Sequence, residues 1–251
     1  MDLGLTDRTY LLTGATRGLG FATARELVAD GANVVLTGRT EESAAAAAAS
    51  LGDRALGVAA DNAAADAPDR LLAAARARFG GLDGVLISVG GPAPGTAADN
   101  TDEQWQSAFE SVFLGAVRLA RAAAAELPAG GVIGFVLSGS VYEPISGLTI
   151  SNGLRPGLAG FAKSLANELG PRGIRVLGVL PGRIATDRMT QLDALSGDPE
   201  GSHARNCASI PLGRYGTPEE FGRTAAFLLS PAASYVTGVM VPVDGGARHG
   251  F

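Results

Sequence analysis

The chain has 251 residues, a hydrophobic fraction of 46%, a charged fraction of 18% and a formal net charge of −5. These values are typical of one globular α/β domain with a sizeable core, and they lack the basic excess of a nucleic-acid-binding protein. No apolar run approaches the roughly 20 residues of a membrane span and no secretory signal is recognisable, so neither a membrane nor nucleic acid is an expected partner. The single cysteine, Cys207, excludes an internal disulfide and favours a cytoplasmic location.

Short apolar runs alternate with longer helix-patterned stretches along the whole chain. The predicted strands are Thr9–Leu12, Val34–Thr37, Leu56–Ala59, Gly84–Ser88, Val132–Leu137, Arg175–Leu180 and Met240–Val243. The predicted helices are 18–30, 41–51, 66–79, 102–127, 153–170 and 218–230. Because the strands are apolar on both faces and separated by helices, they predict a parallel sheet that is covered on each side. The expected fold class is α/β: a single doubly wound Rossmann domain over residues 1–251, with a parallel seven-stranded sheet flanked by helices on both faces.

One segment, residues 187–216, departs from this alternation. It has weak periodicity and contains Gly197, Pro199 and Gly201, so we expect a long loop or a pair of short helices. Connections of this length inside a compact domain are usually functional, and we interpret the segment as a substrate lid. The alternative is a merely mobile insertion.

A glycine-rich stretch, TGATRGLG, follows the first predicted strand and precedes a predicted helix. Gly14 allows a tight turn, Gly18 lets a pyrophosphate approach the backbone, and Gly20 lets the helix pack close to the sheet. The start of the helix then presents free N–H groups and a positive dipole end to the phosphates. This arrangement predicts that the chain binds a dinucleotide.

The spacing TGxxxGxG resembles that of the short-chain dehydrogenase/reductase family. Further segments resemble the family in the same order over essentially the whole chain: AADN (59–62), LPGRIAT (180–186), PLGRYGTPEE (211–220) and VTGVMVPVDGG (236–246). The resemblance implies that Asp61 lies against the adenine amine and that Ile184 and Thr186 lie near the nicotinamide carboxamide. The cofactor-binding residues that it implies are Gly14, Thr16, Arg17, Gly18, Leu19, Gly20, Arg39, Asp61, Asn62, Gly90, Arg155, Pro181, Gly182, Ile184 and Thr186.

The choice between NAD and NADP is indicated by charge at the end of the second predicted strand. NAD-preferring proteins place an acidic residue there for the ribose diol, whereas this chain has Gly38 followed by Arg39. Arg17 lies inside the glycine loop, and a guanidinium at either position pairs well with a 2′-phosphate. NADP(H) is therefore the expected cofactor; the alternative is that both arginines are solvated surface charges.

The catalytic residues depart from the family. Its reductases use a Ser, a Tyr-x-x-x-Lys pair and a supporting Asn. Alignment of residues 155–176 with the corresponding helix of the family places Arg155 at the lysine. Ser151 then falls at the tyrosine, which gives an SxxxR pattern. Ser138 fits the serine position with Ser140 as a close rival, and Val112 falls at the asparagine. This combination is similar to a divergent subgroup that resembles 3-oxoacyl-acyl-carrier-protein reductases.

These replacements limit the chemistry of the site. A serine hydroxyl is a much weaker acid than a phenol, whose pKa is about 10, so Ser151 is a poor general acid. Arg155 stays protonated, but it can still bind a ribose, a carboxylate or a developing oxyanion. Tyr142 is a candidate replacement for the missing phenol; the alternative is that it only packs over its loop. The candidate catalytic residues are therefore Ser138, Ser151, Arg155 and Tyr142.

The expected function is that of an atypical NADP(H)-dependent reductase or dehydrogenase acting on a small carbonyl compound, imine or activated alkene. Two alternatives stay open: a non-redox lyase, isomerase or cyclase on the same fold, and a catalytically silent NADP-binding homologue. No metal site is expected, because His203 and Cys207 have no further His or Cys nearby. The resemblance also implies a homo-oligomer, a tetramer or a dimer, formed through helices 102–127 and 153–170 and through the C-terminal strands.

Overall fold

The computed structural model describes residues 1–250, and these residues contain a seven-stranded sheet in the order β3-β2-β1-β4-β5-β6-β7. The strands are β1 (Thr9–Leu12), β2 (Asn33–Gly38), β3 (Ala55–Ala59), β4 (Gly84–Ile87), β5 (Val132–Val136), β6 (Arg175–Pro181) and β7 (Met240–Val243). Every pair of neighbouring strands is parallel. The α/β fold class is therefore confirmed, and each predicted strand end is within one residue of the observed one.

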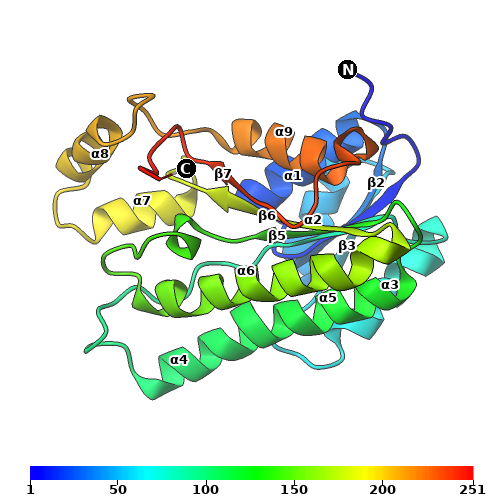
Figure 1. The fold of residues 1–251 in the computed structure, drawn as a ribbon, viewed down its shortest axis with the longest axis horizontal. Helices are drawn as coiled ribbons and strands as arrows, with labels where there is room; N and C mark the ends of the chain where they lie inside the picture. The colour runs from blue at the N-terminus through cyan, green and yellow to red at the C-terminus, as the bar shows by residue number, and fades with distance from the viewer. Residues whose placement is uncertain (251) are drawn as a thin grey trace.

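Two helical layers cover the sheet (Figure 1). The α-helices are α1 (Gly18–Ala29), α2 (Glu41–Leu51), α3 (Ala67–Phe79), α4 (Asp102–Ala108), α5 (Gly115–Glu126), α6 (Thr149–Leu169), α7 (Asp187–Ala194), α8 (Pro199–Ala208) and α9 (Pro218–Leu229). One apolar core lies between the sheet and α3, α5 and α6, and the other between the sheet and α1, α2 and α9. Alternate strand residues supply the two cores: Leu11 belongs to the first, Tyr10 and Leu12 to the second.

Two predicted helices differ from the observed ones. The stretch 102–127 is divided, because a π-helix (Phe109–Leu114) separates α4 from α5. Helix α6 begins at Thr149 and not at 153, although Pro156 lies inside it. Its apolar face carries the helix through the proline, since Ile150, Leu154 and Leu158 are all buried at a spacing of four residues.

The segment 187–216 contains two short helices, α7 and α8, which lie beyond the carboxyl ends of β5 and β6 in Figure 1. This agrees with one of the two predicted forms. The strand order reverses between β1 and β4, and in open parallel sheets a ligand-binding crevice forms outside the carboxyl ends of the strands at such a point. Within residues 1–250, no helix combines the length and the apolarity that crossing a bilayer requires.

Candidate active site

A large open cleft, about 1960 Å³ in volume, lies at the carboxyl ends of the strands. It brings together every residue that the sequence marked as cofactor-binding or catalytic. Its lining includes Gly14, Thr16, Arg17, Gly18, Leu19, Gly20, Arg39, Asp61, Asn62, Gly90, Ser138, Tyr142, Ser151, Arg155, Pro181, Gly182, Ile184 and Thr186. Helix α7 lies in the segment 187–216 that the sequence predicts to be a lid. It forms part of the cleft wall through Arg188, Met189 and neighbouring residues.

The glycine loop has the backbone geometry that its sequence predicts. Gly14 and Gly18 have φ values of 55° and 59°, the left-handed region that favours glycine. A Cβ on Gly14 would lie 2.6 Å from the carbonyl oxygen of Ser88, and a Cβ on Gly20 would lie 2.9 Å from the Cα of Ala15. No side chain caps the N-terminus of α1, so its first amides remain available to an anion in the cleft.

Space at the end of β2 supports the charge argument about the cofactor. A Cβ on Gly38 would lie 2.5 Å from Cγ2 of Thr16 and 2.9 Å from Oγ of Ser43, so an acidic side chain there would require these two side chains to move. Arg39 is exposed beside it. Arg17 forms a 3.4 Å ion pair with Asp187 of the lid, but both side chains are exposed, so this pair is weak.

The opposite wall is built from the segment that follows β6. Ile184 is buried and forms an isolated parallel bridge with Gly216, which attaches this segment to the chain before α9. Gly182 packs against Asp244, whose Cα would lie 2.6 Å from a Cβ there. Thr186 precedes the first residue of α7, and its side chain makes no capping hydrogen bond, which leaves the hydroxyl free to bond a ligand in the cleft.

The three serines near the catalytic position do not lie at the same depth. Ser138 lines the cleft at the end of β5, and its Oγ accepts a 3.1 Å hydrogen bond from the amide of Ser140. Ser140 is buried below the surface, and its Oγ lies 3.2 Å from Oγ of Ser151. Ser138 is therefore the serine whose hydroxyl can reach a molecule in the cleft, whereas Ser140 holds Ser151 in place.

Arg155 is buried in the floor of the cleft with no carboxylate partner among the described residues. Its Nη1 donates to the carbonyl oxygen of Val136 at 2.6 Å, and its Nη2 donates to that of Val89 at 3.2 Å. The Nε has no hydrogen-bond partner. Burial lowers the pKa of the guanidinium to about 10, because the charged form is desolvated. The side chain thus joins the ends of β4 and β5 and places an uncompensated positive charge beneath the cleft.

The hydroxyl of Tyr142 is bonded to the main chain of β7. The Oη donates a 2.9 Å hydrogen bond to the carbonyl oxygen of Met240 on β7, and the guanidinium carbon of Arg248 lies 3.5 Å from the centre of the ring. The side chain is 43% exposed. A proton donated to a main-chain carbonyl is not directed at a substrate, so this arrangement favours the packing alternative over a role as replacement acid.

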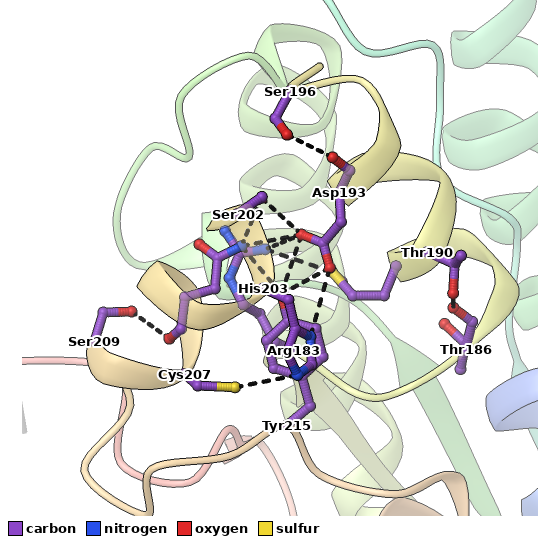
Figure 2. A network of polar contacts seen from close by, with 12 residues as sticks. Arg183, Thr186, Thr190, Asp193, Ser196, Ser202, His203, Cys207, Ser209 and Tyr215 are labelled. Atoms are coloured by element: carbon purple, nitrogen blue, oxygen red, sulfur yellow. Dashed lines mark hydrogen bonds and ion pairs between the residues drawn. The ribbon is translucent and has the colours of Figure 1, made fainter. Parts of the chain in front are cut away.

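A buried carboxylate fixes the two lid helices to each other and to the loop before α9 (Figure 2). Asp193 on α7 accepts hydrogen bonds from Ser202 and Asn206 of α8, each at 3.0 Å. The hydroxyl of Tyr215 donates a hydrogen bond shared between the two carboxylate oxygens, at 2.9 and 3.1 Å. Nη1 of Arg183 lies 4.0 Å from Oδ1 of Asp193. Helices α7 and α8 of the predicted lid therefore share a polar cluster with the loop before α9.

His203 and Cys207 lie side by side on α8, with Sγ 3.5 Å from Nε2. His203 also packs on the ring of Tyr215, with centroids 4.3 Å apart. Among residues 1–250, no group of three His, Cys, Asp or Glu side chains is arranged to hold a metal ion.

Two residues of the site were missed by sequence reasoning. Asp193 carried no local signal, because its burial depends on α8 and on the loop before α9. Arg188 carried a local sequence signal, because it is a basic residue in the first turn of a helix. The helix dipole disfavours a cation at that place, which suggests that another contact requires the arginine there.

Comparison with known proteins agrees with this geometry. A family model described as enoyl-(acyl carrier protein) reductase matches residues 14–248. A 3-oxoacyl-[acyl-carrier-protein] reductase of Vibrio cholerae is 31% identical over 97% of this chain and 98% of its own. The human dehydrogenase/reductase SDR family member 4 is 34% identical over 96% of this chain and 88% of its own. The crystal structure of L-sorbose reductase from Gluconobacter frateurii, complexed with NADPH and L-sorbose, is 31% identical, has a TM-score of 0.93 and covers 100% of both chains.

Proposed function

The chain belongs to the short-chain dehydrogenase/reductase family, a family of oxidoreductases, and from this premise we propose that it is an NADP(H)-dependent reductase of activated alkenes or iminium ions. One observation carries the proposal. The cofactor end of the cleft keeps the family's form, whereas the position of the family's tyrosine holds Ser151, whose hydroxyl is buried against Ser140. The site is therefore suited to reductions that do not need a positioned phenol.

The residues of the cofactor end fit NADP(H). The uncapped amides of α1 would hold the pyrophosphate, and Arg39 and Arg17 would pair with the 2′-phosphate. The side chains of Thr16 and Ser43 crowd the position of Gly38, where an acidic residue would repel this phosphate. The bound cofactor supplies a hydride. The sorbose reductase, which has the same fold, was crystallised with NADPH.

The catalytic end would act by electrostatics and orientation. Ser138 can donate its hydroxyl proton in a hydrogen bond to a carbonyl oxygen, because its Oγ already accepts from Ser140. The buried charge of Arg155 would stabilise the negative charge that develops on that oxygen when the β-carbon of an enone is reduced. Solvent then supplies the proton at the α-carbon. A simple ketone would instead need an acid at its own oxygen, a contribution of about 10²–10⁴-fold in rate.

A matched pair of substrates tests the proposal. We expect cyclohex-2-enone to be reduced by NADPH roughly 10²-fold or more faster than cyclohexanone, since only the ketone needs the missing acid. The product should be cyclohexanone, formed by reduction of the C=C bond, and gas chromatography distinguishes it from the allylic alcohol. Efficient reduction of cyclohexanone would contradict the proposal.

We also propose that the chain forms a homo-oligomer through α4–α5 and α6. Phe109 is 42% exposed and stacks on Phe113, with ring centroids 5.3 Å apart, and Gly157 lies beside this pair. Exposed aromatic rings next to small residues suit close helix contact between two copies, and closed symmetry is usual for homo-oligomers. Light scattering at micromolar concentration should give the mass of a dimer or a tetramer, two or four times 25.2 kDa; the monomer mass would reject the idea.

A further inference from the structure

Arg188, like Arg155, is an arginine of the cleft that has no carboxylate partner among residues 1–250. It lies on the second position of α7 and is part of the cleft wall. Burial lowers the pKa of its guanidinium, which shows that the side chain has lost part of its hydration. Most arginines elsewhere on the surface form ion pairs, as Arg205 does with Asp198 on the neighbouring lid helix. An arginine that is partly desolvated without a counter-ion is a candidate to receive one from a ligand.

The guanidinium is held in place across the cleft. Its Nη2 donates a 2.9 Å hydrogen bond to the carbonyl oxygen of Pro92, in the loop that follows β4. The edge of the guanidinium formed by Nε and Nη2 faces Gly91, where a Cβ would be 3.2 Å from both nitrogens. The absence of a side chain at Gly91 thus lets a lid residue reach the opposite wall. Only one of the five N–H groups has a partner within the described chain, so the others are available to a bound molecule.

The position of Arg188 on its helix is unfavourable by itself. The first turn of a helix has a positive dipole end, which disfavours a cation and favours Asp187, the acidic residue that precedes it. Among the described residues no ion pair joins Asp187 to Arg188; the carboxylate of Asp187 lies 3.4 Å from the guanidinium of Arg17 instead. An anion near the start of α7 would be stabilised by both the guanidinium and the helix end. The local electrostatics therefore favour an anionic ligand group at this place.

We propose that Arg188 is a specificity-determining residue that binds a carboxylate of the substrate, so that the reducible substrate is a small acidic enone or iminium compound. This inference rests on the proposed reductase function for the identity of the reducible group, but not for the carboxylate site. Arg188 bonds to the loop after β4, and Ser138 and Ser151 line the same cleft. A carboxylate held there would orient the rest of the molecule in the cleft.

The probes are the 3-carboxylate of cyclohex-2-enone and its methyl ester, which share the ring and differ in charge. Calorimetric titration into protein saturated with NADP⁺ measures binding without turnover, because no hydride is present. We expect the wild type to bind the carboxylate roughly 10- to 100-fold more tightly than the ester, as for a charge-assisted hydrogen bond. Arg188→Gln should abolish this preference, Arg188→Lys should restore part of it, and the matched lid control Arg205→Gln should keep it in full.

Three results would overturn the inference. The first is equal binding of acid and ester by the wild type, and the second is an unchanged preference for the acid in Arg188→Gln. The third is weaker NADP⁺ binding in Arg188→Gln that fully accounts for its weaker binding of the acid. The last would assign Arg188 to the cofactor pyrophosphate. Turnover of the acid with NADPH is measured separately. A carboxylate preference that depends on Arg188, without any turnover, would support the site and contradict the reductase function, so that the two failures are distinguishable.

Discussion

The two ends of the cleft differ in where their polar groups find partners. At the adenosine end, the amides at the start of α1 have no side-chain cap and Arg39 is exposed, so these groups are left to a ligand. At the catalytic end, Ser151 bonds with Ser140, Arg155 donates to two main-chain carbonyls, and the hydroxyl of Tyr142 donates to another. The difference teaches that cofactor binding and proton transfer are separable in this fold. The cofactor end leaves its polar groups to a cofactor. At the catalytic end, Ser151, Arg155 and Tyr142 form hydrogen bonds within the protein.

The largest effect on stability is expected from a substitution that removes the internal hydrogen bonds of the catalytic end. Arg155→Ala leaves the carbonyls of Val89 and Val136 without their donors, and we expect it to lower the free energy of unfolding by about 4 kcal/mol. Urea denaturation followed by circular dichroism measures this loss. The exposed Arg121→Ala on α5 is the control and should change stability by less than about 0.5 kcal/mol. If both variants were equally stable, the floor of the cleft would not depend on this arginine.

The next effect concerns the open end. Arg39→Ala removes a guanidinium from the place expected for the 2′-phosphate, and NADPH should bind about 10- to 100-fold more weakly, because one charge-assisted hydrogen bond is lost. NADH, which lacks the phosphate, should bind unchanged. Fluorescence titration with both cofactors provides the measurement. Equal affinity of the wild type for the two would refute the assignment of the cofactor.

The lid gives a smaller effect. Asp193→Asn keeps the shape of the side chain but replaces a charged acceptor by a neutral one, so the free energy of unfolding should fall by about 1.5 kcal/mol. Calorimetric melting measures it, with the exposed Glu200→Gln on α8 as the control. KM for cyclohex-2-enone should rise more than kcat falls, since the lid positions the wall and not the reacting atoms. A loss confined to kcat would point to a direct chemical role.

The smallest effect is expected at two hydroxyls that the sequence placed among the candidate catalytic residues, those of Ser151 and Tyr142. Ser151→Ala and Tyr142→Phe should each change kcat/KM for cyclohex-2-enone by less than about threefold, because neither group is a positioned proton donor. Steady-state assays across pH 6 to 9 provide the comparison. A loss of 10²-fold in Tyr142→Phe would make that phenol the substitute acid and would remove the contrast between the two ends.

The cofactor end was predictable because its determinants are contiguous in the chain. Gly14, Gly18 and Gly20 lie close together in the chain, between residues 14 and 20. Their roles follow from backbone angles and close contacts that glycine alone permits. The charge at Arg39 follows its strand directly. By contrast, Ser138 and Ser140 are two residues apart, and the sequence favours Ser138 with Ser140 as a close rival. Only the packing of α6 against the end of β5 decides which of them is buried.

The sequence by itself determined the strand and helix alternation, the glycine loop and the absence of the family's tyrosine and lysine. These depend on short-range periodicity and on the identity of single positions. Tertiary structure alone decided that Tyr142 turns toward β7, that Asp193 is buried, and that Arg188 crosses the cleft to Pro92. The partners of these side chains come from remote segments of the chain. Burial and hydrogen-bond direction arise only when folding brings those segments together, so no local pattern could encode them.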